Sequence, residues 1–325
     1  MFPCSSGTSS RARTGPFTPE NSVAVTHQHH PRCVHEHDGG ARADRARGTH
    51  RGGGVMSARL RGIARETEQI VAAGRYRAPD GREVSLAKAV SAARAGTRLY
   101  GPRPLEIPQL SPVKTLIEVT GESSLQAAHR LYGDTPVAVL NFASARNPGG
   151  GFLNGAQAQE EALCRASALY TCIREARGFY DHHRTHRDPF YTDRVIHSPG
   201  VPVFRDDRGD LLTEPYTVGF LTSPAPNASV VLRTTPERAP QLPGALATRA
   251  ERVLEVAAAH GYRRLVLGAW GCGVFGNDPT HVAGAFRGLL VGGRFEGHFE
   301  HVVFGVLDRT RDAVVRGAFE REFSA

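Results

Sequence analysis

Apolar residues recur along this chain with two different periods. Apolar positions three or four residues apart predict helices over 57–74, 85–96, 123–132, 158–176, 243–260, 280–290 and 310–323. Short apolar or β-branched runs predict strands at 115–120, 137–140, 194–197, 201–204, 216–221, 264–268 and 301–307. The runs at 137–140 and 264–268 lack polar alternation, which is typical of strands buried on both faces of a sheet. Strands that alternate with helices in this way indicate an α/β domain built in layers.

The first 55 residues differ from the rest. They contain no Leu, Ile, Trp or Tyr and are rich in Arg, Gly, Ser and His, which predicts a disordered basic tail. Three interpretations remain open: a tail that touches a polyanion, a weak metal-binding tract with Cys33, and upstream sequence that is not translated. Met56 stands directly before the first predicted helix, which favours the third interpretation.

Residues 56–110 are expected to form an N-terminal helical accessory layer. Ser57 is a suitable N-cap for the first helix, and Gly74 is a suitable C-terminal stop. A hairpin with Pro-Asp-Gly at 79–81 follows, and a second helix comes after it. Residues 111–325 hold the predicted strands of the sheet and are expected to form the main domain.

Composition limits the possible partners. With 40 Lys and Arg against 32 Asp and Glu, the formal net charge is +8. This charge favours anionic partners such as phosphates or nucleic acid, although it also serves solubility. No run approaches the roughly 18 apolar residues of a membrane span, so no membrane contact is expected. Five cysteines without a C-x-x-C pair suit a reducing compartment, and we expect a cytoplasmic protein.

A glycine-rich loop follows the buried strand at 137–140. The motif N-P-G-G-G-F-L-N-G-A-Q-A-Q-E-E covers residues 147–161 and includes Gly149, Gly150, Gly151, Gln159, Glu160 and Glu161. Consecutive glycines allow positive φ and a close approach of the backbone to a ligand. In open α/β sheets, ligands bind at loops that lead from a strand to a helix. The sequence therefore predicts a ligand cradle with acidic side chains beside it.

A second glycine-rich loop follows the strand predicted at 264–268. It contains Gly271, Cys272, Gly273, Val274, Phe275 and Gly276, and Asn277 or Asp278 can cap the next helix with Pro279 at its first position. Successive N–H groups of such a loop bind phosphate, aided by the helix dipole. Together the two loops describe a nucleotide-sugar site with acid chemistry.

Two alternatives for the second loop remain. The glycines could serve only a tight turn, or they could be the G-x-G-x-x-G fingerprint of a Rossmann-type NAD oxidoreductase. The acid that this fingerprint requires would be Asp308, which lies 32 residues after Gly276 instead of about 20. That spacing disfavours the oxidoreductase.

Other candidate chemistry is weaker. Cys272 has no His or Asn close in sequence as a partner, so packing against the loop is favoured over a nucleophilic role. Cys164 and Cys172 are expected in the core, and Trp270 is expected either in the core or as an anchor of the loop. Three histidines stand close together: His182, His183 and His186. They are adjacent rather than at a convergent helical spacing with a carboxylate, so a solvated loop is favoured and no metal is expected.

The motif at 147–161 resembles the sequence mark of bacterial-type poly(ADP-ribose) glycohydrolases, in which three glycines are followed after seven residues by Q-E-E. The resemblance covers roughly residues 57–325, including N-F-A-S at 141–144, and the second glycine loop stands in the same order. It implies a three-layer α/β/α macrodomain with a mixed, largely buried sheet, the accessory layer at its N-terminus, and no cofactor. Ser144 stands where animal members have Asn, so ribose contacts there are not carried over.

The resemblance also implies roles for individual residues. Glu161 would be the catalytic acid and Glu160 the neighbour that orients ribose, while the two glycine loops would hold the distal ribose and the diphosphate. Phe275 would press on the distal ribose, and Glu122 is a candidate for an adenine contact. By the same resemblance, the accessory layer would cap the cleft and limit attack to chain ends.

The implied reaction is hydrolysis of ribose–ribose O-glycosidic bonds in poly(ADP-ribose), which releases ADP-ribose. Neighbouring residues on a helix point about 100° apart, so Glu161 is expected to act alone, first as general acid and then as base. A hydrolase of single ADP-ribose units on protein or nucleic acid would share these residues, whereas a non-catalytic ADP-ribose reader would need no carboxylate pair. The expected partners are poly(ADP-ribose) or ADP-ribosylated protein, and nucleic acid only if itself ADP-ribosylated. The chain is expected to be a monomer.

Overall fold

The computed structural model describes residues 51–324, with side chains from Val55 onwards. The tail expected over 1–55 therefore lies, up to residue 50, outside the described residues. The described residues belong to one compact unit. The backbone of residues 51–55 already belongs to its first helix, α1 (Arg51–Ala73).

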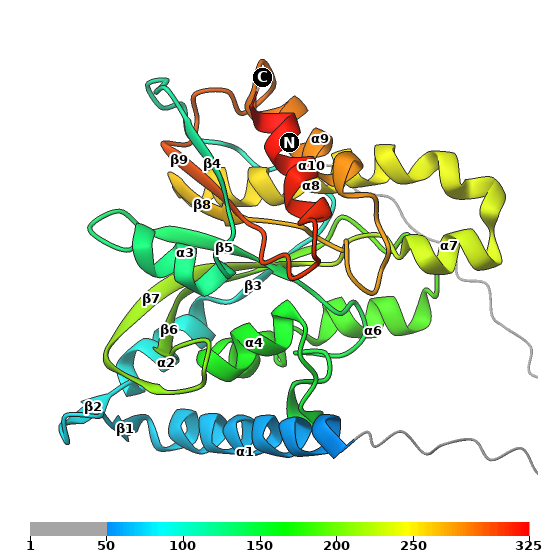
Figure 1. The fold of residues 1–325 in the computed structure, drawn as a ribbon. Helices are drawn as coiled ribbons and strands as arrows, with labels where there is room; N and C mark the ends of the chain where they lie inside the picture. Colours follow the sequence, from blue (N-terminus) through cyan, green and yellow to red (C-terminus); the bar gives the residue numbers. More distant parts are fainter. Residues whose placement is uncertain (1–50, 325) are drawn as a thin grey trace, which may run out of the picture. The chain divides into compact units, whose positions relative to one another are not determined.

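A seven-stranded mixed sheet forms the centre of this unit (Figure 1). In spatial order its strands are β3 (Arg98–Tyr100), β6 (Val195–Arg205), β7 (Leu211–Ser223), β5 (Val137–Phe142), β8 (Arg264–Leu267), β9 (His301–Gly305) and β4 (Leu116–Thr120). Neighbours from β7 to β4 are parallel, whereas β6 pairs antiparallel with both β3 and β7. The mixed sheet expected from the sequence is confirmed.

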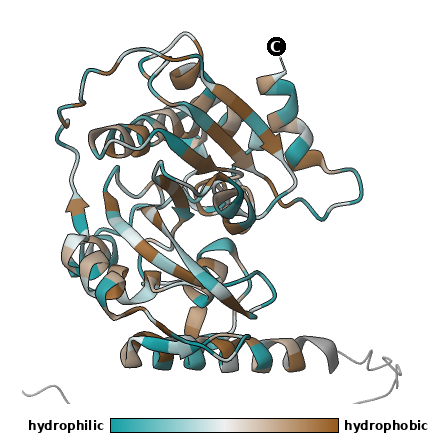
Figure 2. Cartoon of the chain, turned by 90° about the vertical axis from the view of Figure 1, so that its left-hand side faces the viewer, coloured by the Kyte–Doolittle hydropathy of each residue, from teal (hydrophilic) through white to brown (hydrophobic). Residues whose placement is uncertain are grey.

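The central strands are buried because their side chains alternate between two apolar cores. In β5, Val137 and Val139 belong to one core, while Ala138 and Leu140 belong to the other. All four side chains are at most 1% exposed, as the lack of polar alternation predicts. The hydropathy colouring in Figure 2 shows apolar residues concentrated on these inner strands.

Helices cover both faces of the sheet, which confirms the three-layer α/β/α architecture (Figure 1). One core includes residues of α1, α2 (Ala87–Gly96), α3 (Ser124–Leu131), α4 (Gln159–Ala166), α5 (Leu169–Ile173) and α6 (Arg177–Thr185). The other includes residues of α8 (Leu242–Ala259), α9 (Pro279–Leu290) and α10 (Val314–Phe323), and α7 (Ala228–Thr234) with the 3-10 turn η2 (Pro236–Gln241) connects β7 to α8. Within residues 51–324, no helix combines the length and apolar character that a bilayer span requires.

The N-terminal segment contributes a strand to the main sheet. α1 stops before Gly74 (φ 66°), as predicted, and the hairpin is formed by β1 (Arg75–Arg77) and β2 (Glu83–Ser85). Ser57 is not an N-cap, because the helix already begins at Arg51; its hydroxyl instead donates to the carbonyl of Asn154 at 3.3 Å. β3 then pairs with β6 and becomes an edge of the seven-stranded sheet.

Three further local predictions are wrong. The helix expected over 158–176 is interrupted at Ser167, because this residue forms a bridge with Val203 of β6. β6 is one strand with an irregularity after Ser198 instead of two strands. The histidines expected in a solvated loop lie at the end of α6, where the rings of His182 and His186 stack with their centroids 4.0 Å apart.

Candidate active site

The first glycine loop connects β5 to α4 through tight turns. Gly149 and Gly150 have φ angles of 67° and 56°, and the loop continues through the 3-10 turn η1 (Phe152–Asn154). A Cβ on Gly150 would collide with Oε1 of Glu161 and lie 3.2 Å from Oε2 of Glu160. Gly150 is therefore required both by its backbone conformation and by the close approach of two carboxyl groups.

Glu161 lies in the first turn of α4 and is only 7% exposed. Its Oε1 accepts a hydrogen bond from the N–H of Gly151 at 2.8 Å. Its Oε2 is buried and has no hydrogen-bond partner among the described residues. A buried polar atom without a partner requires an explanation, and the first glycine loop lies directly against this carboxyl group.

Glu160 is buried more deeply, at 2% exposed. Its Oε2 accepts from the N–H of Ser144 at 2.7 Å, and its Oε1 accepts from the side-chain amide of Asn141 at 3.3 Å. Burial outweighs these bonds and raises the pKa of Glu160 to about 8, so this carboxyl keeps its proton at neutral pH. Although neighbouring side chains leave a helix about 100° apart, both carboxyl groups reach Gly150.

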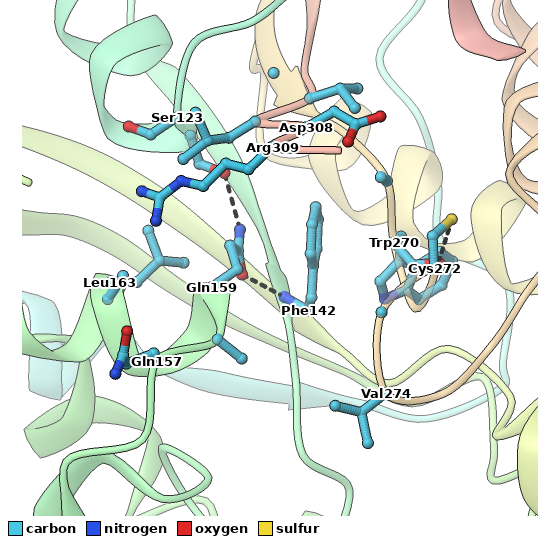
Figure 3. Close-up of a pocket in the computed structure, with 18 of the residues that line it drawn as sticks. Ser123, Phe142, Gln157, Gln159, Leu163, Trp270, Cys272, Val274, Asp308 and Arg309 are labelled. Atoms are coloured by element: carbon cyan, nitrogen blue, oxygen red, sulfur yellow. Dashed lines mark hydrogen bonds between the residues drawn. The ribbon is translucent and has the colours of Figure 1, made fainter. Parts of the chain in front are cut away.

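Gln159 holds α4 against β5. Its Oε1 accepts from the N–H of Phe142 at 2.9 Å, and its Nε2 donates to the hydroxyl of Ser124 at 3.0 Å (Figure 3). The same Nε2 also donates to the carbonyl of Leu140 at 2.8 Å. Both amide hydrogens are therefore already used within the fold. These bonds hold the first turn of α4, which carries Glu160 and Glu161, against β5. Gln159 also lines the cavity described below, and its expected contact with substrate stays a prediction.

The base of the second glycine loop is rigid. Asp278 is the N-cap of α9 and accepts from the N–H of Thr280 at 2.8 Å, with Pro279 at the first helical position as predicted. Asn277 is buried, and its Nδ2 donates to the carbonyls of Pro226 at 2.8 Å and Gly271 at 3.2 Å. These bonds fix the loop between α7 and α9.

The tip of this loop is open. The backbone N–H groups of Gly273, Val274 and Phe275 have no hydrogen-bond partner among the described residues, and the Val274 side chain is 88% exposed. Consecutive unpaired N–H groups close to a helix N-terminus form a concave site for an anion. The loop is therefore suited to phosphate oxygens.

A cavity of about 760 Å³ lies between the start of α4 and the second glycine loop (Figure 3). Its walls come from 123–125, 142, 157–159, 162–163, 269–275 and 305–309, with Met56, Arg59 and Leu60 of α1. This volume is within the range of pockets that hold nucleotide-sized ligands. Glu160 and Glu161 do not line the cavity, but Gln159 and Ala162 of the same helix do. The two glutamates therefore lie next to residues that form the cavity wall, without being part of that wall themselves.

Cys272 packs against the loop, as the sequence analysis favoured. Burial raises the pKa of its thiol to about 12, which leaves almost no thiolate at neutral pH. Trp270 is 1% exposed and donates from Nε1 to the carbonyl of Ser223 at 3.0 Å. Cys164 and Cys172 are fully buried, so all three side chains lie in the core as expected.

Two acids considered earlier have partners of their own. Asp308 accepts bonds from Thr310 and from the backbone N–H groups at the start of α10, and these bonds lower its pKa to about 2. Both carboxylate oxygens of Asp308 are engaged in these bonds, which disfavours the Rossmann alternative, because that alternative needs this acid to bind a ribose hydroxyl. Glu122 pairs with Arg130 at 2.8 Å and does not line the cavity, so its contact with adenine stays a prediction. Among the described residues, no group of three or more His, Cys, Asp or Glu side chains is arranged to hold a metal ion.

Side chains from distant segments also line the cavity, and none of them was predicted from the sequence. Arg59 of α1, Asp207 of the β6–β7 turn and Arg309 after β9 all line it. Arg59 also donates to the carbonyl of Arg208 at 2.6 Å, which ties α1 to the β6–β7 turn. No local pattern distinguishes these residues from ordinary surface charges. Asn141, by contrast, belongs to the N-F-A-S stretch at 141–144 on which the family resemblance partly rests.

A three-layer α/β/α domain with glycine loops after two adjacent parallel strands, an acid pair and a nucleotide-sized cavity defines a macrodomain-like ADP-ribose site. The family model for microbial-type PARG, catalytic domain, matches residues 64–206. The poly(ADP-ribose) glycohydrolase (PARG) of Thermomonospora curvata, solved with the inhibitor ADP-HPD, is 52% identical with a TM-score of 0.75, and the match covers 82% of this chain and 100% of that one. The chain therefore belongs to the bacterial poly(ADP-ribose) glycohydrolases.

A second solved structure supports the same family. The PARG of Deinococcus radiodurans in complex with ADP-ribose is 48% identical with a TM-score of 0.66, and the match covers 72% of this chain and 96% of that one. No curated protein matches the chain.

Proposed function

We propose that this chain hydrolyses the ribose–ribose O-glycosidic bonds of poly(ADP-ribose) and releases ADP-ribose. The observation that carries the proposal is the unpaired, buried Oε2 of Glu161 beside a cavity with a phosphate-binding loop on its far side. The family supports the substrate, since one relative is solved with ADP-ribose bound. A reader of ADP-ribose would need the loops and the cavity but no buried acid pair.

In the proposed mechanism the second glycine loop holds the diphosphate. Its unpaired backbone N–H groups at 273–275 donate hydrogen bonds to the phosphate oxygens, and their partial positive charges attract the diphosphate. Phe275, at the end of this tip, packs against the distal ribose and keeps the scissile bond facing α4. Glu160, held by Asn141 and Ser144, uses its retained proton to orient a ribose hydroxyl.

Glu161 then performs the proton transfers. It donates a proton to the ribose oxygen that leaves, as the bond from that oxygen to the anomeric carbon breaks through an oxocarbenium-like transition state. The resulting carboxylate removes a proton from the water that attacks the anomeric carbon, which restores the acid.

The remaining partners follow from this chemistry. ADP-ribosylated protein is a substrate through its polymer, and nucleic acid interacts only where it carries ADP-ribose. We place the enzyme in the cytoplasm as a monomer, in keeping with the free cysteines Cys164, Cys172 and Cys272. The accessory segment 56–110 lines the cavity with Met56, Arg59 and Leu60 and adds β3 to the sheet, while 111–325 provides the other strands of the catalytic domain.

The experiment is incubation of the purified chain with poly(ADP-ribose), with mono-ADP-ribosylated protein and with mono-ADP-ribosylated DNA, all in chelator. The readout is released ADP-ribose. Release from polymer alone, lost in Glu161→Gln, is the expected result. Release from the singly modified substrates instead would identify a mono-ADP-ribosyl hydrolase. Binding of ADP-ribose without any release would identify a reader and refute the assignment of Glu161.

A further inference from the structure

Tyr191 has a backbone conformation that an aromatic residue rarely adopts. Its φ is 57°, and it is one of two described residues other than glycine, with Ala313, whose φ is positive. The residue lies in the turn between α6 and β6, where its N–H donates to the carbonyl of Asp188 at 3.1 Å. For a bulky side chain such a φ is strained and persists only where surrounding contacts enforce it.

The ring of Tyr191 stands between the two glycine loops of the site. On one side the guanidinium of Arg146, from the first loop, lies 5.9 Å from the ring centroid. On another side the Phe275 ring, from the second loop, lies 5.9 Å away at an interplanar angle of 44°. The buried His183 meets the Tyr191 ring edge-on at 5.8 Å. Geometries of this kind are attractive for cation–π and aromatic pairs.

The groups around this ring are themselves anchored. Arg146 donates from Nε to the carbonyl of His183 at 3.2 Å. The N-terminus of α7 links the turn that holds Tyr191 to the second glycine loop. The N–H of Asn227 donates to the carbonyl of Pro189 at 2.8 Å, and the N–H of Ser229 donates to the carbonyl of Phe275 at 2.9 Å. The strained turn and the loop that carries Phe275 therefore share one support.

Simple core packing does not account for this arrangement. Tyr191 is half-buried and does not belong to the apolar cores, and its hydroxyl has no hydrogen-bond partner within residues 51–324. What the strained backbone achieves is contact between the Tyr191 ring and Phe275, a residue that lines the cavity.

We infer that Tyr191 is a positioning residue: its ring, held by a strained turn and by Arg146, fixes Phe275 of the second glycine loop against the ligand. The inference rests on the proposed function only for the identity of the ligand. Tyr191 itself touches neither the acid pair nor the cavity, and it acts through Phe275.

The test is a double-mutant cycle with Tyr191→Leu, Phe275→Leu and the double variant of the full chain. The readouts are Kd for ADP-ribose, kcat and KM on poly(ADP-ribose), and Tm. Each single change is expected to weaken ADP-ribose binding on the order of tenfold. The double variant is expected to bind ADP-ribose no more weakly than the weaker-binding of the two single variants. The effects of substitutions at contacting residues that act as one unit are not additive.

Three further variants separate the role of the Tyr191 ring from that of the backbone turn and of a neighbouring side chain. Tyr191→Phe retains the ring and is expected to bind within about twofold of wild type. Tyr191→Gly adopts φ 57° without strain, so it preserves the turn and is expected to lose binding as Tyr191→Leu does. Phe190→Leu alters the neighbouring side chain, which packs on Arg238, and is expected to lower Tm and to combine additively with Phe275→Leu.

Additive losses for Tyr191→Leu and Phe275→Leu, or a change in Tm alone, would overturn the positioning role. Failure of the proposed function looks different. The wild-type chain would then release no ADP-ribose, while the cycle measured on ADP-ribose binding would still decide the role of Tyr191.

Discussion

Gly150→Ala tests whether the first glycine loop exists to admit the acid pair. The new Cβ would collide with Oε1 of Glu161 and stand 3.2 Å from Oε2 of Glu160. An alanine at φ 56° adds strain of about 1–2 kcal/mol. Displacement of Glu161 also breaks its bond from Gly151, and an intramolecular hydrogen bond contributes about 0.5–1.5 kcal/mol.

The two effects together lower the free energy of unfolding by about 1.5–3.5 kcal/mol, which corresponds to a fall in Tm of roughly 3–14 °C for a chain of this size. The effect on catalysis is larger, because misplacement of a catalytic group by about 1 Å reduces the rate about 10²-fold. Differential scanning fluorimetry and ADP-ribose release from polymer measure the two quantities.

Gly81→Ala is the matched control. Gly81 has φ 86°, but no atom lies within 4 Å of a Cβ built there. This variant is expected to show the strain alone, with a loss of about 1–2 kcal/mol in stability and unchanged activity. If Gly150→Ala lost no more stability than Gly81→Ala and kept its activity within about threefold, the glycine would not be confining the acid pair.

Three further predictions concern single side chains. Glu161→Gln is expected to reduce ADP-ribose release on the order of 10²–10⁴-fold with Kd for ADP-ribose nearly unchanged; activity within tenfold of wild type would refute its acid–base role. Burial raises the pKa of Glu160 from 4.5 to about 8, so between these pH values the folded chain holds a proton that the unfolded chain has lost. Its contribution to the free energy of unfolding therefore falls as pH rises through that window, and Glu160→Gln should remove this part of the slope in thermal melts from pH 5 to 8; equal slopes would contradict the raised pKa. Cys272→Ala is expected to keep kcat within about threefold, because the pKa of the thiol is about 12, and loss of activity would reopen a chemical role for this cysteine.

The positions of most elements were predictable, because the signals are local. The buried strand at 137–140, the cap at Asp278 with Pro279 after it, and the stop at Gly74 all appear as predicted. The failures have a common cause. Ser167 interrupts a helical pattern because it pairs with Val203, and β3 could not be recognised because its partner β6 lies about a hundred residues further on. Pairing between distant segments overrides local periodicity.

The sequence by itself determined which loops carry the chemistry. Glycine runs, adjacent acids and helix caps are properties of consecutive residues, so the motif at 147–161 and the loop at 271–276 could be assigned to a ligand site without coordinates. Only the tertiary structure decided what each side chain does there. It placed the polar groups of Gln159 on β5, left Oε2 of Glu161 without a partner, and raised the pKa of Glu160. It also brought Tyr191 and Arg146 to Phe275. Burial, desolvation and contacts between distant segments depend on packing, and packing exists only once the whole sheet and its helices have assembled.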